Sequence, residues 1–195
     1  MKVLLHACCG PCASACIPVL RSMGHDPVLL FSNSNIAPQE EFEKRLDALR
    51  ILAKAEKTAL IVDPPDHGAW LDNVAQGLEN EPEKSLRCAK CFRWNLSRTS
   101  EIAKAENIPA FTTSLTVSPH KVSSMVFKAG AEISQEKFLP VDFKKNDGFK
   151  KSLIRSKELG LYRQSWCGCE FSRRKTDGSL VGTEGLEPPR LRTGT

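Results

Sequence analysis

The stretch Lys2–Ser32, KVLLHACCGPCASACIPVLRSMGHDPVLLFS, decides the fold. It opens with a short apolar run, Lys2–Ala7, that is typical of a buried strand. A helix is expected over Pro11–Met23, because proline occupies its first turn and Gly24 follows its last residue. A second apolar run, Pro27–Ser32, comes soon after. Strand, helix and strand in this order predict two parallel strands joined by a right-handed crossover.

The same alternation continues downstream. Apolar residues recur with helical spacing from Pro38 to Lys57, and a third apolar run follows at Thr58–Val62. Further helices are expected over His67–Leu78, Phe92–Asn107 and His120–Ala131, and further strands over Ala110–Thr116 and Phe138–Asp142. The sequence therefore predicts a three-layer α/β domain with a parallel sheet over residues 1–172, with a helical C-terminal part.

Composition is ordinary for a globular protein. The chain has 195 residues, of which 41% are hydrophobic and 26% charged. No apolar run approaches the roughly 20 residues that span a bilayer, and the N-terminal MKVLLHACC is too short in apolar residues for a signal peptide. We expect a cytoplasmic protein without a membrane partner. The polar segment 173–195 lacks periodicity, so we expect a disordered tail, whose composition also fits a non-native extension.

Cysteine usage carries the main functional signal. Structural disulfides are rare in the cytosol, so clustered cysteines there more often bind a metal or carry out redox chemistry. The first group comes directly after the first expected strand, at the start of a helix. Ligands of open parallel sheets bind at such positions, and the field of a helix N-terminus favours thiolates. The eight cysteines form three groups: Cys8, Cys9, Cys12 and Cys16; Cys88 and Cys91; and Cys167 and Cys169.

Four thiolates from the first two groups make the best metal site. A C-x-x-C pair places two sulfurs on one side of a turn, and the strand-to-helix turn can bring an adjacent pair together. The spacing fits either zinc or an iron–sulfur cluster, and inert buried thiols are the remaining alternative. Cys12 is close enough to the turn to touch a bound metal, whereas Cys16 is expected in the core. The expected ligands are Cys8, Cys9, Cys88 and Cys91.

The last two cysteines form a C-x-C pair, Cys167-Gly168-Cys169. A disulfide across so short a ring is strained and comparatively reducible. This pattern favours a redox role, with extra metal ligation as the alternative. His6, just before the cysteine turn, is a candidate proton donor, and a structural histidine is the alternative for it.

A basic stretch follows the last expected strand. Residues 141–175 contain ten lysines and arginines against four acidic residues, a net charge of +6. Such a surface suits RNA, and a solvated basic helix face is the alternative. The candidate phosphate ligands are Lys150, Lys151, Arg155 and Arg163.

Four blocks in the same order resemble the cobalamin-independent epoxyqueuosine reductases of the QueH type: LHACCGPC, RCAKCFRWNLSRT, FTTSLTVSPHK and SKELGLYRQSWCGCEFS. They span nearly all of residues 2–172. The resemblance implies reduction of the epoxide of epoxyqueuosine, at the wobble position of tRNA, to queuosine. It also implies an electron donor and an adenine nucleotide alpha-hydrolase (HUP-like) fold. The implied site is a [4Fe–4S] cluster on Cys8, Cys9, Cys88 and Cys91, a redox-active disulfide between Cys167 and Cys169, and Cys12 as a ligand of an additional iron ion.

The chain departs from that family pattern at His120-Lys121, where a Tyr-Gln or similar pair is usual, and at Trp166, where tyrosine is common. Both positions lie outside the expected ligands, so the departures concern substrate contacts only. A zinc-thiolate RNA-binding module without catalysis is the main alternative function. A tRNA thiolation enzyme would need an SGGxDS-like ATP loop, which the sequence lacks. A thiol–disulfide oxidoreductase would carry its C-x-x-C at a helix start directly after a strand, whereas Cys88–Cys91 is expected to follow a polar loop.

Overall fold

The computed structural model describes residues 1–173. The strands are β1 (Lys2–His6), β2 (Asp26–Phe31), β3 (Leu60–Val62) and β4 (Ala110–Thr113). The α-helices are α1 (Gly10–Ser22), α2 (Gln39–Ala55), α3 (His67–Trp70), α4 (Leu86–Ala105), α5 (Ser123–Ile133) and α6 (Gly148–Glu158). The expected disordered tail lies outside the described residues except for Arg173. No helix in the described part of the chain is long and apolar enough to cross a membrane.

The four strands form one parallel sheet in the order β3-β2-β1-β4. From β1 the chain continues to β2, which pairs with β1 on one side. Strand β4 pairs with β1 on the other side. The gap beyond the carboxyl ends of β1 and β4 is therefore the point where the strand order reverses, and open α/β sheets bind their ligands at this point.

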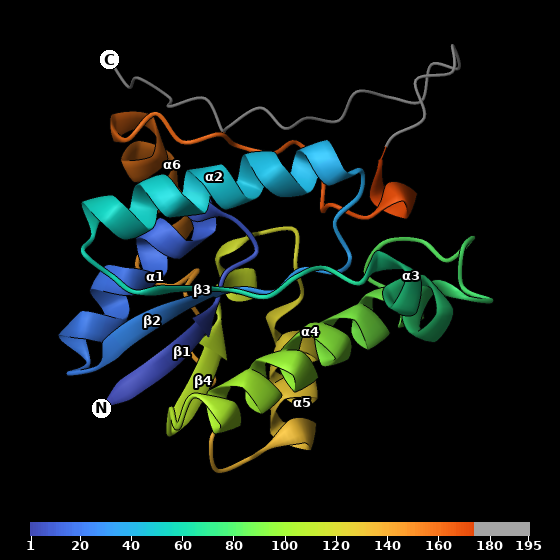
Figure 1. Ribbon diagram of the computed structural model, residues 1–195, viewed down its shortest axis with the longest axis horizontal. Helices are drawn as coiled ribbons and strands as arrows, with labels where there is room; N and C mark the ends of the chain where they lie inside the picture. The colour runs from blue at the N-terminus through green and yellow to red at the C-terminus, as the bar shows by residue number, and fades with distance from the viewer. Residues whose placement is uncertain (174–195) are drawn as a thin grey trace, which may run out of the picture.

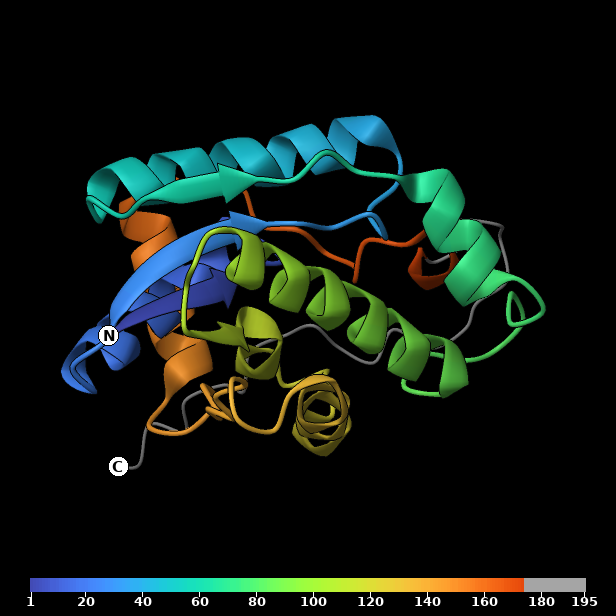
Figure 2. The same cartoon turned by 60° about the horizontal axis from the view of Figure 1, so that its bottom comes forward.

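Helices cover both faces of the sheet, with α1 and α2 on one side and α4 and α5 on the other (Figures 1 and 2). The alternation of side chains along each strand explains the two layers. Leu5 and Leu29 face the core formed with α1 and α2, whereas Leu4 and Leu30 face the core formed with α4 and α5. The predicted three-layer parallel α/β class is confirmed.

The expected fifth strand does not form. Phe138 makes only an isolated parallel bridge to Phe111 of β4, through Phe111 N–H to Lys137 O at 2.9 Å and Leu139 N–H to Phe111 O at 2.8 Å. The next N–H on the same side of this segment, that of Val141, donates back to Leu139 O at 2.9 Å, so the ladder ends there.

Two helix boundaries also differ from expectation. Helix α4 begins at Leu86, six residues before the expected start, because Leu86 is exposed and Arg87 is buried there, so the opening residues show no apolar stripe. Cys88–Cys91 therefore lies in the opening turns of a helix, which follows a polar loop as expected. The expected helix over His67–Leu78 is only the single turn α3, followed by a π-helical turn at Leu71–Ala75.

Candidate functional site

The site forms where β1 and β4 end. Cys8 lies two residues past β1, and its backbone N–H donates to the Ser114 hydroxyl at 3.1 Å. The same hydroxyl lies 3.5 Å from the Cys8 sulfur. Ser114 is the first residue after β4, so this contact fastens the cysteine turn to the reversal point of the sheet.

Cys8, Cys9 and Cys12 bring three sulfurs together, all within 4.8 Å of one another. Cys9 caps helix α1, and its sulfur accepts the backbone N–H of Cys12 at 3.5 Å. The next residue must be Gly10, because a Cβ there would lie 2.7 Å from the Ala48 carbonyl oxygen of α2. The Cys8 and Cys9 sulfurs are 3.9 Å apart. Two sulfurs on one tetrahedral ion with bonds of about 2.3 Å would be about 3.8 Å apart.

These three thiols favour a single negative charge on Cys8. Hydrogen bonds from Cys12 and Cys9 hold the pKa of Cys8 well below its ordinary value, against the effect of burial. The Cys12 hydrogen bond lowers the pKa of Cys9, but donation to Cys8 and burial raise it to about 12. Donation to Cys8 and burial also raise the pKa of Cys12. A bound cation would release the remaining protons, because metals bind thiolates.

Cys88 and Cys91 lie at i and i+3 near the start of α4, where the helix dipole favours negative charge. Cys91 reaches the site, and its sulfur accepts a long contact from the Asn95 amide at 3.9 Å. Burial raises the pKa of Cys91. The Cys88 sulfur instead accepts the backbone N–H of Lys84 at 3.3 Å and lies outside the cavity described below. Of the C-x-x-C pair, only Cys91 lines that cavity.

A buried ion pair holds the C-x-C loop over the cysteine turn. The Arg45 guanidinium of α2 donates to Glu41 Oε1 at 2.6 Å, to Cys167 O at 2.9 Å and to Trp166 O at 3.2 Å. Both side chains of the pair are almost completely buried, 1% and 3% exposed. Gly168 has φ of +130°, and a Cβ there would lie 3.1 Å from Arg45 Nη1, so the middle position of the loop requires glycine.

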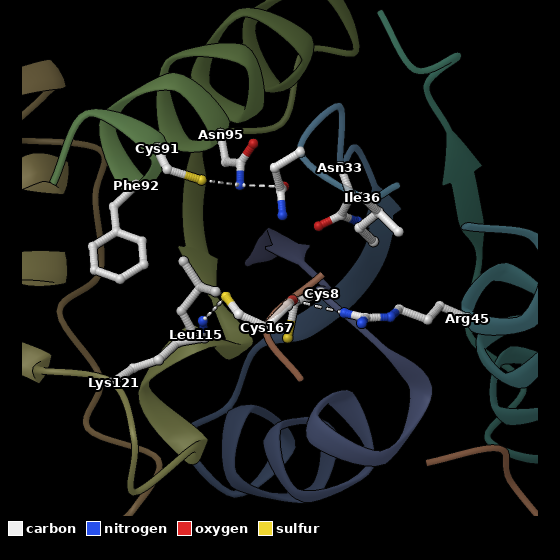
Figure 3. A pocket seen from close by; sticks show the side chains of 11 residues that line it. Cys8, Asn33, Ile36, Arg45, Cys91, Phe92, Asn95, Leu115, Lys121 and Cys167 are labelled. Atoms are coloured by element: carbon white, nitrogen blue, oxygen red, sulfur yellow. Dashed lines mark hydrogen bonds between the residues drawn. The ribbon is translucent and has the colours of Figure 1, made fainter. Parts of the chain in front are cut away.

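Cys8, Cys91 and Cys167 line one small cavity together with Lys121 and three asparagines (Figure 3). Its volume is about 20 Å³, room for about one water. The Lys121 ammonium donates to the Cys167 sulfur at 2.9 Å. Both members of the C-x-C pair carry free thiols, with Cys169 buried and its pKa raised by that burial. The cavity thus joins one sulfur from each of the three cysteine groups.

Two residues near the turn are structural. His6, the last residue of β1, is buried between the neighbouring strands β2 and β4. Its Nε2–H donates to Ser32 O at 3.2 Å, and its Nδ1 accepts from the Thr113 hydroxyl at 2.9 Å. Burial lowers the pKa of His6, so the ring is neutral and has no proton free for chemistry. Cys16 is fully buried in the core beside α2, as expected.

The candidate phosphate ligands occupy different environments. Lys150 and Lys151 are exposed on α6, and Arg163 is exposed with its guanidinium 5.1 Å from the Phe149 ring. Arg155 is already paired with carboxylates, Glu56 at 2.7 Å and Glu158 at 3.0 Å, which reduces its capacity to bind phosphate.

Sequence reasoning missed the polar residues that organise the site. Lys121 stands at a position where the chain departs from the family pattern. This departure was expected to concern substrate contacts only, so the contact between Lys121 and Cys167 was not predicted. Glu41 and Arg45 left a signal, because they stand at i and i+4 beside the apolar stripe of α2. Gln164, whose amide donates to the Cys9 sulfur at 3.0 Å, left none.

Comparisons with known proteins identify the family. Residues 3–175 match the model of the family described as "Epoxyqueuosine reductase QueH". The chain is 32% identical to the "Epoxyqueuosine reductase QueH" of Streptococcus pyogenes serotype M1, over 92% of this chain and 73% of the relative. It is 33% identical to the protein of the same name from Thermotoga maritima, over 87% of this chain and 89% of the relative.

One solved structure shares the fold. It is described as the predicted subunit of tRNA methyltransferase from Methanocaldococcus jannaschii, with a TM-score of 0.50 and 11% identity over 83% of this chain and 89% of that one. The likeness bears on architecture alone and agrees with the expected three-layer α/β domain. With a family match over nearly the whole chain, the protein belongs to the QueH family of epoxyqueuosine reductases.

Proposed function

We propose that this protein reduces the epoxide of epoxyqueuosine in tRNA to the alkene of queuosine, in the cytoplasm. Family membership and the names of its relatives support the reaction. The observation that carries the proposal here is the single cavity at the sheet reversal point, lined by Cys8, Cys91 and Cys167. Ligand thiols and a redox thiol can act together only if they meet, and these sulfurs come from three segments far apart in the sequence.

The proposed cofactor is a [4Fe–4S] cluster held by Cys8, Cys9, Cys88 and Cys91. The donor chemistry fits, because thiolates are the usual cluster ligands. A second observation also fits: the buried Trp70 indole N–H lies beside the Cys91 thiol and makes no closer hydrogen bond within the described residues. Such an N–H can donate to a sulfur of the cluster. Hydrogen bonds to these sulfurs adjust the reduction potential of the cluster. When bound, the cluster would supply one-electron transfer beside the substrate.

The three converging sulfurs support a second metal site. Cys12 lies within reach of Cys8 and Cys9, and we propose it as a ligand of an additional iron ion next to the cluster. The spacing of 3.9 Å between the Cys8 and Cys9 sulfurs also fits a single tetrahedral ion. This distance favours the second candidate function, a zinc-thiolate RNA-binding module without catalysis. Iron and inorganic sulfide analysis separates the two, since zinc without sulfide excludes the cluster.

We propose the Cys167/Cys169 pair as the two-electron donor. Conversion of an epoxide to an alkene takes up two electrons and two protons and releases one water. Oxidation of two thiols to a disulfide supplies the same two electrons and two protons. Arg45 holds the backbone carbonyl of Cys167 at 2.9 Å, which fixes the loop while its sulfur faces the cavity. An external electron donor must then reduce the disulfide after each turnover.

The proposed RNA contacts are the exposed cations of the C-terminal part. Lys150, Lys151 and Arg163 are free to bind phosphates of a tRNA with a queuosine-type anticodon. Arg155 is the weakest member of the set, because two carboxylates already bind it. A cavity of about 20 Å³ is too small for a modified base, so the substrate must displace part of its lining.

Turnover with matched cysteine variants tests the proposal. Anaerobically reconstituted wild-type protein should convert epoxyqueuosine in tRNA over many turnovers when given a reductant, as read by nucleoside mass spectrometry. Cys167→Ser should keep the wild-type iron and sulfide content and lose multiple turnover. Cys16→Ala, which removes a buried thiol from the core, should keep both. Full multiple turnover by Cys167→Ser would overturn the redox role of the C-x-C pair.

A further inference from the structure

Lys121 occupies the turn between β4 and α5, and its ammonium group points into the cysteine cavity (Figure 3). The 2.9 Å hydrogen bond from Nζ to the Cys167 sulfur is its only side-chain hydrogen bond within residues 1–173. Its backbone carbonyl accepts from the Lys144 ammonium at 2.7 Å, which fixes the turn. The ammonium also lies 5.6 Å from the centre of the Phe92 ring. Lys121 is therefore held against one sulfur of the redox pair.

The charges around Lys121 indicate the role of its contact with Cys167. The Lys121 side chain is largely buried, and such an ammonium is costly unless a negative group lies beside it. In the described part of the chain, no ion pair joins Lys121 to a carboxylate, and the acidic groups facing it are the thiols Cys167, Cys8 and Cys91. Arg45 also lines the cavity, but its charge is already balanced by Glu41. The balancing charge therefore falls on sulfur, with Cys167 in direct contact.

Other proton donors near the cavity are excluded in turn. His6 is neutral, and both of its ring nitrogens are already paired. The Arg45 guanidinium does not release a proton in proteins. The amides of the lining asparagines cannot act as acids. Cys8 and Cys91 are proposed metal ligands, which bind as thiolates. Lys121 is thus the one lining side chain, apart from the cysteines, that holds a transferable proton next to Cys167. Burial lowers the pKa of Lys121, but the neighbouring thiols raise it overall, so its proton is released as Cys167 loses its charge.

We propose that Lys121 is a catalytic residue, which keeps Cys167 as a thiolate and donates a proton to the epoxide oxygen as its carbon–oxygen bonds break. The inference rests on the proposed function. At the start, Lys121 is an ammonium, Cys167 a thiolate and Cys169 a thiol. Two electrons leave the sulfurs and a Cys167–Cys169 bond forms. Both carbon–oxygen bonds break and a carbon–carbon double bond forms. The oxygen leaves as water with one proton from Lys121 and one from Cys169. Lys121 ends as a neutral amine, recharged when the disulfide is reduced.

Three substitutions in the full-length, metal-loaded protein test the proposal. Lys121→Gln removes both the charge and the proton. Lys121→Arg keeps a cation beside Cys167 but cannot act as an acid. Lys128→Gln is the charge-matched control, an exposed residue of α5 outside the site. Each variant is assayed for iron and sulfide content and for single-turnover conversion of epoxyqueuosine in tRNA by prereduced protein. The rate of Cys167 alkylation by iodoacetamide at pH 7 is read by peptide mass spectrometry.

Lys121→Gln should slow single turnover by about 100-fold or more, the usual worth of a general acid, and slow Cys167 alkylation by about 10-fold, with wild-type iron and sulfide. Lys121→Arg should restore alkylation but not turnover. Lys128→Gln should match the wild type in both. Turnover by Lys121→Gln within about threefold of wild type would overturn the proposal, and turnover restored by Lys121→Arg would overturn its proton-donor part. If wild-type protein converts no epoxyqueuosine, the proposed function fails and proton donation fails with it. The alkylation rates then decide separately whether Lys121 keeps Cys167 as a thiolate.

Discussion

Replacing Arg45 by methionine tests how the C-x-C loop is held. The change keeps an unbranched side chain but removes the donors to Glu41, Cys167 and Trp166. Glu41 then stays buried without its cation, since both side chains are at most 3% exposed. Breaking a buried ion pair from one side costs about 3–5 kcal/mol, a large part of a total stability of about 5–15 kcal/mol. Arg45→Met should therefore be severely destabilised.

Equilibrium unfolding in urea, under anaerobic reducing conditions, measures this cost. With a slope of about 2 kcal/mol per molar urea, a loss of 3–5 kcal/mol lowers the unfolding midpoint by about 1.5–2.5 M. Arg50→Met is a matched control on the same helix, because its partner Asp47 is 64% exposed and Arg50 is 56% exposed. That exposed pair should contribute less than about 1 kcal/mol.

A double substitution separates the buried charge from the lost hydrogen bonds. Glu41→Gln combined with Arg45→Met leaves no unpaired buried carboxylate, so it should recover about 1 kcal/mol or more relative to Arg45→Met alone. An Arg45→Met midpoint within the range of the Arg50→Met control would refute the view that this ion pair anchors the loop.

Three other substitutions probe separate parts of the structure. Gly168→Ala should cost about 1–3 kcal/mol, because φ is +130° there, and should lower turnover; an unchanged thermal midpoint would contradict this. Burial raises the pKa of Asp63, but its hydrogen bonds with Arg98 and with a serine hydroxyl outweigh that effect and lower it. The ionised Asp63 carboxylate therefore stabilises the fold fully when the pH is above the ordinary aspartate pKa of about 3.9, and this stabilisation is lost as the pH falls below that value. The stability gap between wild type and Asp63→Asn should narrow below about pH 4, and a constant gap in acid urea titrations would refute this. Replacing Lys150 and Lys151 by glutamine should reduce the salt dependence of tRNA binding by about one to two in log–log slope; an unchanged slope in filter binding would remove these lysines from the interface.

The sequence predicts the layers of the fold well because periodicity reports burial directly. The apolar runs that become β1 and β2 are buried on both faces, so they stand out from their surroundings. The start of α4 was missed because its opening residues do not follow the apolar-inside pattern, with Leu86 exposed and Arg87 buried. The expected fifth strand stops after Leu139, because Val141 N–H donates back to Leu139 O and not to β4, a turn that the apolar run Phe138–Asp142 does not reveal.

The site was predictable only in part for a related reason. Cysteines reveal a metal or redox role through their spacing, so Cys8, Cys9 and Cys12 were expected together, and their sulfurs do converge. Lys121 and Arg45 act through contacts more than 40 residues away along the chain, which no local pattern encodes. The placement of Cys91, but not Cys88, on the cavity depends on the rotation of α4, which packing decides.

The coupling of the disulfide to the product is the most direct test of the central claim. Prereduced, metal-loaded protein is mixed anaerobically with excess tRNA carrying epoxyqueuosine and no added reductant. Queuosine is counted by nucleoside mass spectrometry, and the Cys167–Cys169 disulfide by peptide mass spectrometry. The account predicts one queuosine formed for each disulfide formed. Queuosine without the disulfide, or no queuosine from protein with its full iron and sulfide content, would contradict it.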